Sequence, residues 1–179
     1  MDTKLFFDTE FTGLHQKTTL ISLGIVSDDD RIFYAEFNDY DRTQVDNWLQ
    51  KNVINNLTLK PNSSRITKSG NVYINGTTIK IRRSLLDWIS KLDKIVMWSD
   101  CLSYDWVLIN DLFGTALDIP KNISYIPLDI CTMFALKGID PDINREEFVK
   151  ELITEEPRKH NALWDAYIIK MCHTKLMSI

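Results

Sequence analysis

The chain has 179 residues, 44% hydrophobic and 26% charged, which is typical of a soluble globular protein with one ordinary domain and a proper core. No apolar run is long enough to span a membrane and no secretory leader opens the chain, so we expect a cytoplasmic protein without membrane contact. Three cysteines, an odd number without a CxxC pair, argue against a disulfide framework and against a structural zinc site.

The formal net charge of −4 by itself argues against a nucleic-acid partner, but the charges are unevenly distributed. No carboxylate lies between Asp46 and Asp87. The same stretch holds a third of the basic residues: Lys51, Lys60, Arg65, Lys68, Lys80, Arg82 and Arg83. This segment is a candidate contact for a phosphate backbone. A solvated face that binds nothing is an equally good reading of the charge alone.

The first predicted element is a buried strand over Leu5, Phe6 and Phe7, and two acids, Asp8 and Glu10, follow it. Because strand side chains alternate between faces, these two acids point the same way. Two like charges so close favour a divalent cation with oxygen ligands, Mg²⁺ or Mn²⁺, between them. Taken alone, the pair fits equally well as two solvated acids at a strand end.

The next elements predict a small antiparallel meander. Strands over 20–26 and 31–37 flank a turn at 27–30. A helix is expected over 43–53 and a loop over 55–70. An Asn75–Gly76 turn between two β-prone runs predicts an added β-hairpin around 72–82. Ser84 is then predicted to be the N-cap of a helix that runs to Leu92.

The second half of the chain alternates strands and helices. We expect a strand over 95–98, a helix from Ser103 to Gly114 and a short fifth strand over 125–128. Helices are predicted over 131–137, over 145–153 and from residue 161 or 162 to about Met177. The order predicts an α/β fold, a mixed five-stranded sheet flanked by helices, as a single domain over 1–179.

Two later stretches add polar residues that fit the first pair. Asp105 lies in the first turn of the helix that follows a core strand. His160 lies in the loop before the last helix, with Asp165 five residues on in its first turns. The topology lets these side chains approach a common site at the carboxyl edge of the sheet.

The three segments resemble the DEDDh exonucleases, the 3′-5′ branch of the RNase H-like superfamily. Asp8 and Glu10 match the D-x-E of the first motif, Asp105 the acid of the second, and His160 and Asp165 the H-x(4)-D of the third. The resemblance covers nearly the whole chain and implies an RNase H-like exonuclease fold.

Within that branch the chain is most similar to the small RNase AS-type exoribonucleases of bacteria and phages. Their F-x-D-T-E-F, I-S-x-G-x-V and Y-D-W patterns are met by residues 6–11, 21–26 and 104–106. Asp100 is the weaker alternative for the second acid. The basic segment and its hairpin match no motif of the family.

The resemblance implies a two-metal-ion mechanism with Mg²⁺ or Mn²⁺ and gives each residue a role. Asp8 bridges both ions, Asp165 and Glu10 hold the ion on the side of the attacking water, and Asp105 reaches the second ion through a bound water. His160 takes the proton of the attacking water, a role that suits an imidazole near neutral pH.

The resemblance also suggests that Thr12, Gly13 and Leu14 meet the terminal nucleotide, with Leu14 wedged between bases. The Phe11 side chain either stacks on a base or is buried beneath the site. The implied reaction is 3′-5′ hydrolysis of single-stranded nucleic acid, with RNA favoured over DNA, releasing nucleoside 5′-monophosphates. A homodimer is expected from the resemblance alone. Two alternatives stay open on the same fold: a catalytically inactive nucleic-acid-binding module and a two-metal endonuclease.

Overall fold

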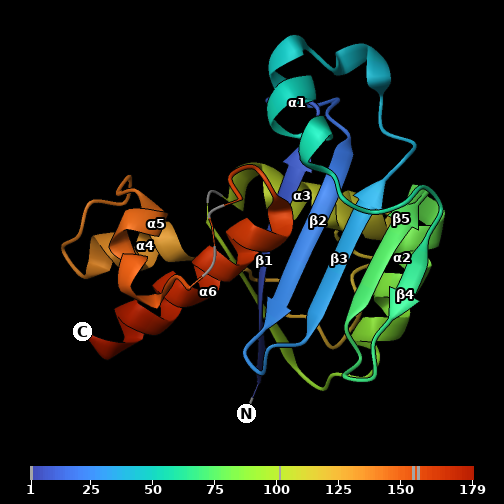
Figure 1. Ribbon diagram of the computed structural model, residues 1–179. Helices are drawn as coiled ribbons and strands as arrows, with labels where there is room; N and C mark the ends of the chain where they lie inside the picture. Colours follow the sequence, from blue (N-terminus) through green and yellow to red (C-terminus); the bar gives the residue numbers. More distant parts are fainter. Residues whose placement is uncertain (1, 101, 155, 157) are drawn as a thin grey trace.

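The computed structural model describes residues 2–100, 102–154, 156 and 158–179. Cys101, one of the three cysteines, lies outside these residues. One seven-stranded sheet, in the order β4-β5-β3-β2-β1-β6-β7, forms the centre of the molecule. Helices α2 (Thr78–Ile89) and α3 (Leu102–Phe113) lie behind the sheet in Figure 1, and α6 (Ala162–Ser178) crosses its front over β1 and β2. The mixed α/β class is confirmed, with two strands more than the five expected.

The N-terminal meander is confirmed. Strands β1 (Thr3–Phe11), β2 (Leu20–Ser27) and β3 (Ile32–Phe37) pair antiparallel in sequence order. The turn between β2 and β3 ends at Asp30, whose φ of 66° is the left-handed conformation that Asp tolerates in turns. On the other side of β1, β6 (Ile95–Ser99) runs parallel to it.

The fifth strand is shorter than predicted and begins later. Strand β7 covers only Leu128–Asp129, parallel to the end of β6. Tyr125 and Ile126, predicted inside the strand, are 78% and 54% exposed. Pro127 has no N–H to donate, so the ladder cannot continue through it.

The prediction of a hairpin over 72–82 is wrong, although a hairpin is present nearby. Its strands are β4 (Ser64–Ile66) and β5 (Val72–Gly76), so β4 lies inside the segment predicted as loop. Instead of turning back at Asn75–Gly76, β5 ends there as a parallel neighbour of β3. The Asn75 side chain accepts from the N–H of Asn62, so it fixes the incoming loop rather than a primed turn.

Helix α2 starts at Thr78. A helix capped by Ser84, as predicted, would have started seven residues later. The Thr77 hydroxyl caps it by accepting from the N–H of Lys80. The apolar positions that face the core begin at Ile81 and continue with Leu85 and Trp88, so the helical period overrides the β-propensity of the Thr-Thr-Ile-Lys-Ile run.

The remaining helices follow the predictions closely. The segment expected as a helix over 43–53 contains α1 (Asn47–Asn52) between two short 3₁₀ turns, η1 (Arg42–Gln44) and η2 (Ile54–Asn56). Helix α4 spans Ile130–Leu136, and α5 (Arg145–Phe148) with η3 (Lys150–Leu152) occupies the predicted helix over 145–153. None of the helices in the described ranges is both long and apolar enough to cross a bilayer.

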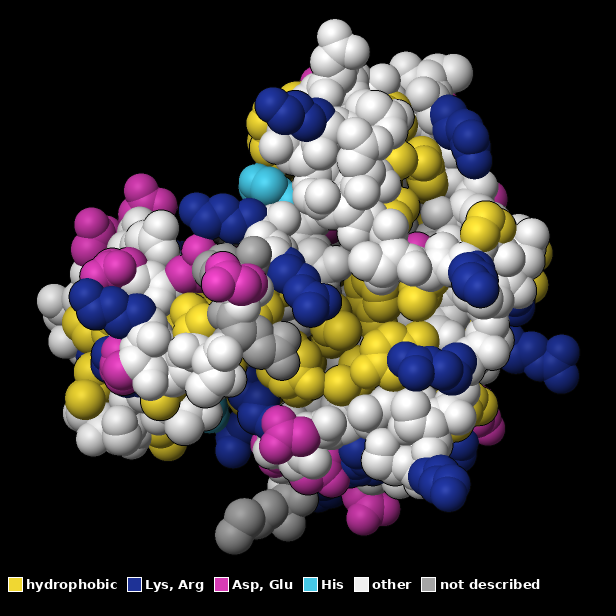
Figure 2. All heavy atoms as spheres, viewed as in Figure 1, with side chains coloured by type: hydrophobic (Ala, Val, Ile, Leu, Met, Phe, Trp, Pro, Cys, Tyr) yellow, Lys and Arg dark blue, Asp and Glu magenta, His cyan; other side chains and the backbone are white. Residues whose placement is uncertain are grey.

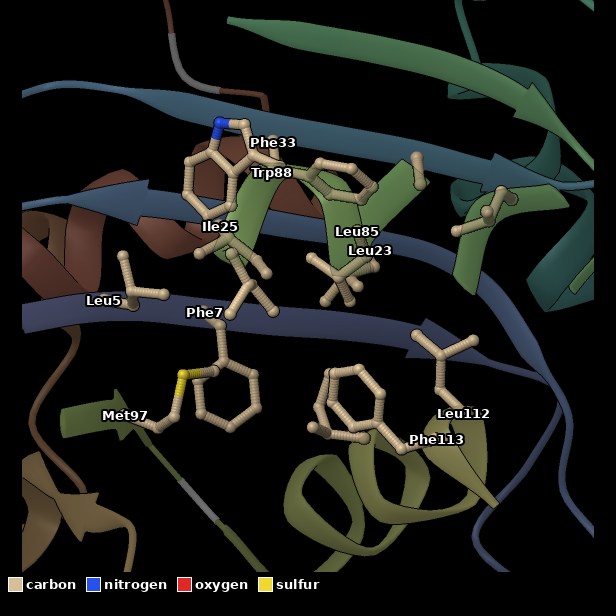
Figure 3. Packing of buried hydrophobic residues seen from close by; sticks show 14 of the residues in the cluster. Leu5, Phe7, Leu23, Ile25, Phe33, Leu85, Trp88, Met97, Leu112 and Phe113 are labelled. Carbon is tan, nitrogen blue, oxygen red and sulfur yellow. The ribbon is translucent and has the colours of Figure 1, made fainter. Parts of the chain in front are cut away.

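Strand β1 divides the core into two parts because its side chains alternate. Leu5 and Phe7 point behind the sheet into the larger cluster, where Figure 3 shows them packed with Leu23, Trp88 and other apolar side chains. Phe6 points forward into a second cluster formed with α4 and α6. Asp8 and Glu10 share the parity of Phe6, so both acids face the side on which α6 lies.

Gly24 of β2 lets α6 approach the sheet. A Cβ built on Gly24 would lie 2.2 Å from the carbonyl oxygen of Ala162 and 2.4 Å from the nitrogen of Leu163, both backbone atoms at the start of α6. No side chain fits there, so the residue at this position must be glycine if the helix is to keep its place.

We therefore expect Gly24→Ala to lower the melting temperature by roughly 5–10 °C, because the added methyl group forces α6 away from β2. Thermal unfolding followed by circular dichroism measures the change. Gly13→Ala is the matched control, since its Cβ would meet only the exposed His15 ring, at 3.0 Å. Equal melting temperatures for the two variants would contradict the close contact.

Candidate active site

The first two acids occupy the end of β1 as predicted. Asp8 and Glu10 pair across the ladder with Gly24 and Ser22 of β2, and a register shift follows between Glu10 and Phe11. Both side chains are half-buried and line one cleft of about 520 Å³. The alternation inferred from the sequence is therefore what places the two carboxylates together.

The last helix supplies the third carboxylate. Asn161 caps α6 by accepting from the N–H of Trp164 at 3.1 Å, which starts the helix just before Asp165. With α6 seated on β2 at Gly24, single carboxylate oxygens of Asp8, Glu10 and Asp165 all lie within 4.8 Å of one another. We call these three residues the acid cluster.

Asp105 lies next to the acid cluster but is not a member of it. Its side chain is 5% exposed, and its carboxylate accepts from the hydroxyl of Thr9, the residue between the two β1 acids. The Ser99 hydroxyl donates to its other oxygen at 3.0 Å. Two hydroxyls thus fix the carboxylate, and its charge still acts on Asp8.

The site is electrostatically crowded. Burial and then the charges of Asp105, Asp165 and Glu10 raise the pKa of Asp8 well above its usual value. Burial followed by Asp165 and Asp105 raises the pKa of Glu10 to about 8. Burial also raises the pKa values of Asp105 and Asp165 to about 7. In each case burial and the neighbouring negative charges make the ionised form of the acid less favourable, and no nearby cation among the described residues compensates fully.

A hard divalent cation fits this donor set. The acid cluster offers only carboxylate oxygens, the ligands that Mg²⁺ and Mn²⁺ prefer, within a spacing that one ion can bridge. A bound cation would also offset the burial and the charge repulsion that together raise these four pKa values.

His160 lies where the sequence predicts, in the loop before α6, and lines the same cleft. It adopts a left-handed backbone with φ of 59°, directly before the Asn161 cap. Its ring meets Trp48 of α1 edge-on, with centroids 4.9 Å apart and planes at 74°. The α1 segment therefore reaches the cleft and touches the imidazole.

Asp100, the alternative second acid, also lines the cleft but is paired with a cation. The Arg145 guanidinium donates to it at 3.1 Å, and the pair is largely buried. Its charge still contributes to the raised pKa of Asp165. Asp105 meets hydroxyls instead of a cation, so the two acids have different surroundings.

The predicted nucleotide contacts lie beside the cleft. Phe11 packs on the core and stacks on Tyr104, with centroids 5.4 Å apart and planes at 20°, which favours its burial beneath the site. Thr12 is 2% exposed and its hydroxyl lies inside the turn. The N–H of Gly13 donates to Thr18 at 3.0 Å. Leu14 alone is fully available, at 77% exposure.

Sequence reasoning missed several residues of the cleft. Trp48 was assigned only to a helix pattern, and its contact with His160 depends on how α1 folds over the end of the sheet. Lys159 and Glu146 line the cleft as a pair 3.8 Å apart. No local signal could have found these contacts, because they join segments far apart in the sequence.

Comparisons with known proteins find similar sequences in one family. The model of one family, described as the 3′-5′ exoribonuclease Rv2179c-like domain, matches residues 3–177. Two Mycobacterium tuberculosis proteins, 3′-5′ exoribonuclease Rv2179c of strain H37Rv and 3′-5′ exoribonuclease MT2234.1 of strain CDC 1551, are similar in sequence. Each is 28% identical over 137 residues, which cover 75% of this chain and 76% of the relative.

Solved structures share the fold. The Mg²⁺- and Mn²⁺-bound form of S. pombe Pop2p superposes with a TM-score of 0.61 at 13% identity, over 98% of this chain and 82% of that one. The Neurospora crassa Pan2 catalytic unit, with its protease and nuclease domain, gives 0.52 at 15% identity, over 99% of this chain and 28% of that one. These similarities confirm the RNase H-like exonuclease fold predicted from the sequence.

The raised pKa values predict an unusual pH dependence of stability in metal-free buffer. Glu10, Asp105 and Asp165 bind protons more tightly when folded than when unfolded, so the free energy of unfolding falls as pH rises from about 5 to about 8. At pH 8, Asp165→Asn should then raise the melting temperature by several degrees because it removes one repelling charge.

Thermal unfolding in EDTA across this pH range tests the expectation. Asp93→Asn, which changes an exposed acid outside the cleft, is the matched control and should leave the curve unchanged. A melting temperature that rises between pH 5 and pH 8, or equal effects of the two variants, would contradict the electrostatic description.

Proposed function

This chain belongs to the Rv2179c-like family of 3′-5′ exoribonuclease domains, and from that membership we propose that it removes nucleotides one at a time from the 3′ end of single-stranded RNA. The observation that supports the proposal most is the convergence of Asp8, Glu10 and Asp165, from the two ends of the chain, within 4.8 Å. Two acids at a strand end are explained equally well by solvent exposure, whereas three half-buried carboxylates and a histidine in one cleft are not.

We propose that Asp8, Glu10 and Asp165 would hold the catalytic metal ions, two Mg²⁺ or Mn²⁺. Asp105, set back behind Thr9, would contribute to metal binding indirectly. When bound, such ions activate the attacking water and neutralise charge on the reacting phosphate and the leaving oxygen.

His160 is the proposed general base. Its imidazole takes a proton from the attacking water, whose oxygen forms a bond to the terminal phosphorus. The bond from phosphorus to the 3′-oxygen of the preceding nucleotide breaks, and this oxygen takes up a proton from solvent, which leaves a 3′-hydroxyl on the shortened chain. The released product is a nucleoside 5′-monophosphate. The Trp48 edge and the left-handed backbone at His160 fix the direction of approach of the ring.

The terminal nucleotide is proposed to lie beside the β1 end, against Leu14 and the backbone of Thr12 and Gly13. Phe11, stacked on Tyr104, supports this wall from below. Residues 1–179 are proposed to act as a single exonuclease domain, since one sheet connects all the elements that carry site residues. A homodimer stays a prediction that rests on the resemblance, and a cytoplasmic location stays one that rests on the composition of the chain.

We expect Asp8→Ala and Asp165→Ala to abolish Mg²⁺- or Mn²⁺-dependent hydrolysis while the fold stays intact. The measurement uses a 5′-labelled single-stranded RNA, whose products should form a ladder that shortens from the 3′ end, with circular dichroism to check the fold. A wild-type rate in either folded variant would mean that the site is elsewhere.

The same substrates separate the alternatives. A circular RNA and an RNA with a blocked 3′ end should survive, because an exonuclease needs a free 3′ terminus. Cleavage of the circle would indicate the two-metal endonuclease instead. RNA binding without hydrolysis under any metal would indicate the inactive binding module.

We expect His160→Ala to lower kcat by roughly 10²–10⁴-fold, since the variant loses general-base assistance but keeps the acid cluster. His15→Ala is the matched control, because His15 is an exposed histidine that does not line the cleft. A similar small loss in both variants would show that His160 is not the base.

A further inference from the structure

The front of the sheet carries a surface that hydrolysis at the acid cluster does not use. In Figure 1, α6 covers β1 and β2 on this side, and the described helices leave β3, β5 and β4 uncovered. Figure 2 shows hydrophobic side chains gathered to the right of α6, with Lys and Arg side chains around them. We define the sheet-face groove by four residues: Arg65, Tyr73, Leu163 and Tyr167.

Tyr73 lies on the floor of this groove. Its neighbours Val72 and Ile74 belong to the core behind the sheet, so Tyr73 between them points to the front. Arg65 is its partner on β4, and the guanidinium lies 4.5 Å from the centre of the tyrosine ring. The pair places a cation directly on an aromatic face at the outer edge of the groove.

Helix α6 forms the facing wall. Leu163 and Tyr167 lie one turn apart and are both half-buried. They line a small depression of about 90 Å³ together with Arg158 and Asn161. The wall thus repeats the composition of the floor, apolar or aromatic surface next to a guanidinium.

The groove continues into the active-site cleft. A second depression of about 440 Å³, bounded by residues 55–58, shares Arg158 and Asn161 with the small one. It also shares Lys159 with the cleft that holds the acid cluster. The three hollows are therefore neighbours in a series from the acids to the front of the sheet, and a cationic residue lines both members of each adjacent pair.

A buried hydrogen-bond network holds the loop above these hollows in place. The Glu36 carboxylate, 1% exposed, accepts from the N–H of Thr58 at 2.7 Å and of Leu59 at 3.1 Å, which fixes the loop above the groove. Tyr34 donates to the same carboxylate at 3.0 Å and accepts from Asn161 at 3.4 Å. The loop, the strand and the start of α6 are thus tied together without a ligand.

We propose that the sheet-face groove binds the single-stranded RNA upstream of the 3′-terminal nucleotide. Aromatic rings and guanidinium planes that stack bases, together with cations that neutralise phosphates, are the means by which proteins bind single strands without reading sequence. The proposal rests on the exoribonuclease function, because the 3′ end must lie at the acid cluster for the upstream strand to enter the groove.

Substrate length follows from the geometry. Three strand spacings, about 14 Å, separate β1 from β5. A dinucleotide has a single nucleotide upstream of its scissile phosphate and ends before Tyr73. A longer RNA reaches the groove, so the groove contributes to binding of long substrates only.

The test compares Arg65→Glu and Tyr73→Ala with the wild-type chain on an RNA of about twelve nucleotides and on a dinucleotide. Both variants should bind the longer RNA about tenfold more weakly, measured by fluorescence anisotropy in EDTA, where no hydrolysis occurs. With Mn²⁺, KM for the longer RNA should rise by a similar factor, while kcat and dinucleotide hydrolysis stay unchanged.

Matched controls keep the result specific. Arg83→Glu reverses an exposed charge on α2, behind the sheet, and Tyr125→Ala removes a tyrosine that is 78% exposed near β7. Both should bind the longer RNA within about twofold of wild type. Losses as large as those of the groove variants, or equal losses on the dinucleotide, would overturn the proposal.

Two further outcomes are decisive. If Arg65→Glu dissociates a dimer, measured by light scattering, while RNA affinity is unchanged, the groove is an interface between copies of the chain and the proposal fails. If the wild-type chain hydrolyses nothing but binds the longer RNA through Arg65 and Tyr73, the groove is supported and the exoribonuclease function is what fails.

Discussion

The mutual repulsion of Asp8, Glu10 and Asp165 is the constraint on which the site depends. Three carboxylates within 4.8 Å, with Asp105 close behind, form an arrangement that a metal-free chain would avoid if the acids were free to separate. The apolar packing on both sides of β1 holds them together, since Leu5 and Phe7 anchor the strand behind the sheet and Phe6 anchors it in front. Stability from the two cores thus offsets an unfavourable charge cluster, which is the usual relation between a scaffold and its active site.

The position of α6 completes the site, because it brings Asp165 next to the two acids of β1. Gly24 allows the helix backbone to touch β2, and Asn161 sets where the helix begins. The side-chain amide of the same asparagine donates a hydrogen bond to the hydroxyl of Tyr34 on β3. The backbone of His160, directly before this asparagine, is therefore held in place, although the His160 side chain is exposed. A rigid helix start explains how an exposed histidine keeps a defined direction towards the cleft.

Much of the site could be predicted because it depends on short-range spacing. The alternation at Asp8 and Glu10 and the loop-to-helix step at His160 and Asp165 are local, and their meeting follows from the topology. The hairpin over 72–82 was wrong because the same residues satisfy two local rules, a primed turn and a helix cap, and only the core contact of Ile81 decides between them. The role of Trp48 beside His160 depends on contacts across the fold, which a single sequence does not contain.

Net charge is a poor guide to partners in this molecule because the two signs are separated. Several acids line one cleft, where cations can neutralise them, and the carboxylate-free stretch supplies α1 beside that cleft and the strands β4 and β5 at one edge of the sheet. Not every cation in that stretch is available, however. Lys80 donates to the carbonyl of Asn62 at 3.1 Å, and Arg82 to that of Phe113 at 3.4 Å, so both serve the fold. The few that remain over the front of the sheet, foremost Arg65 on its tyrosine, lie along the path that leads to the acids. It is therefore the arrangement of these cations, and not their number, that suits the chain to a polyanion.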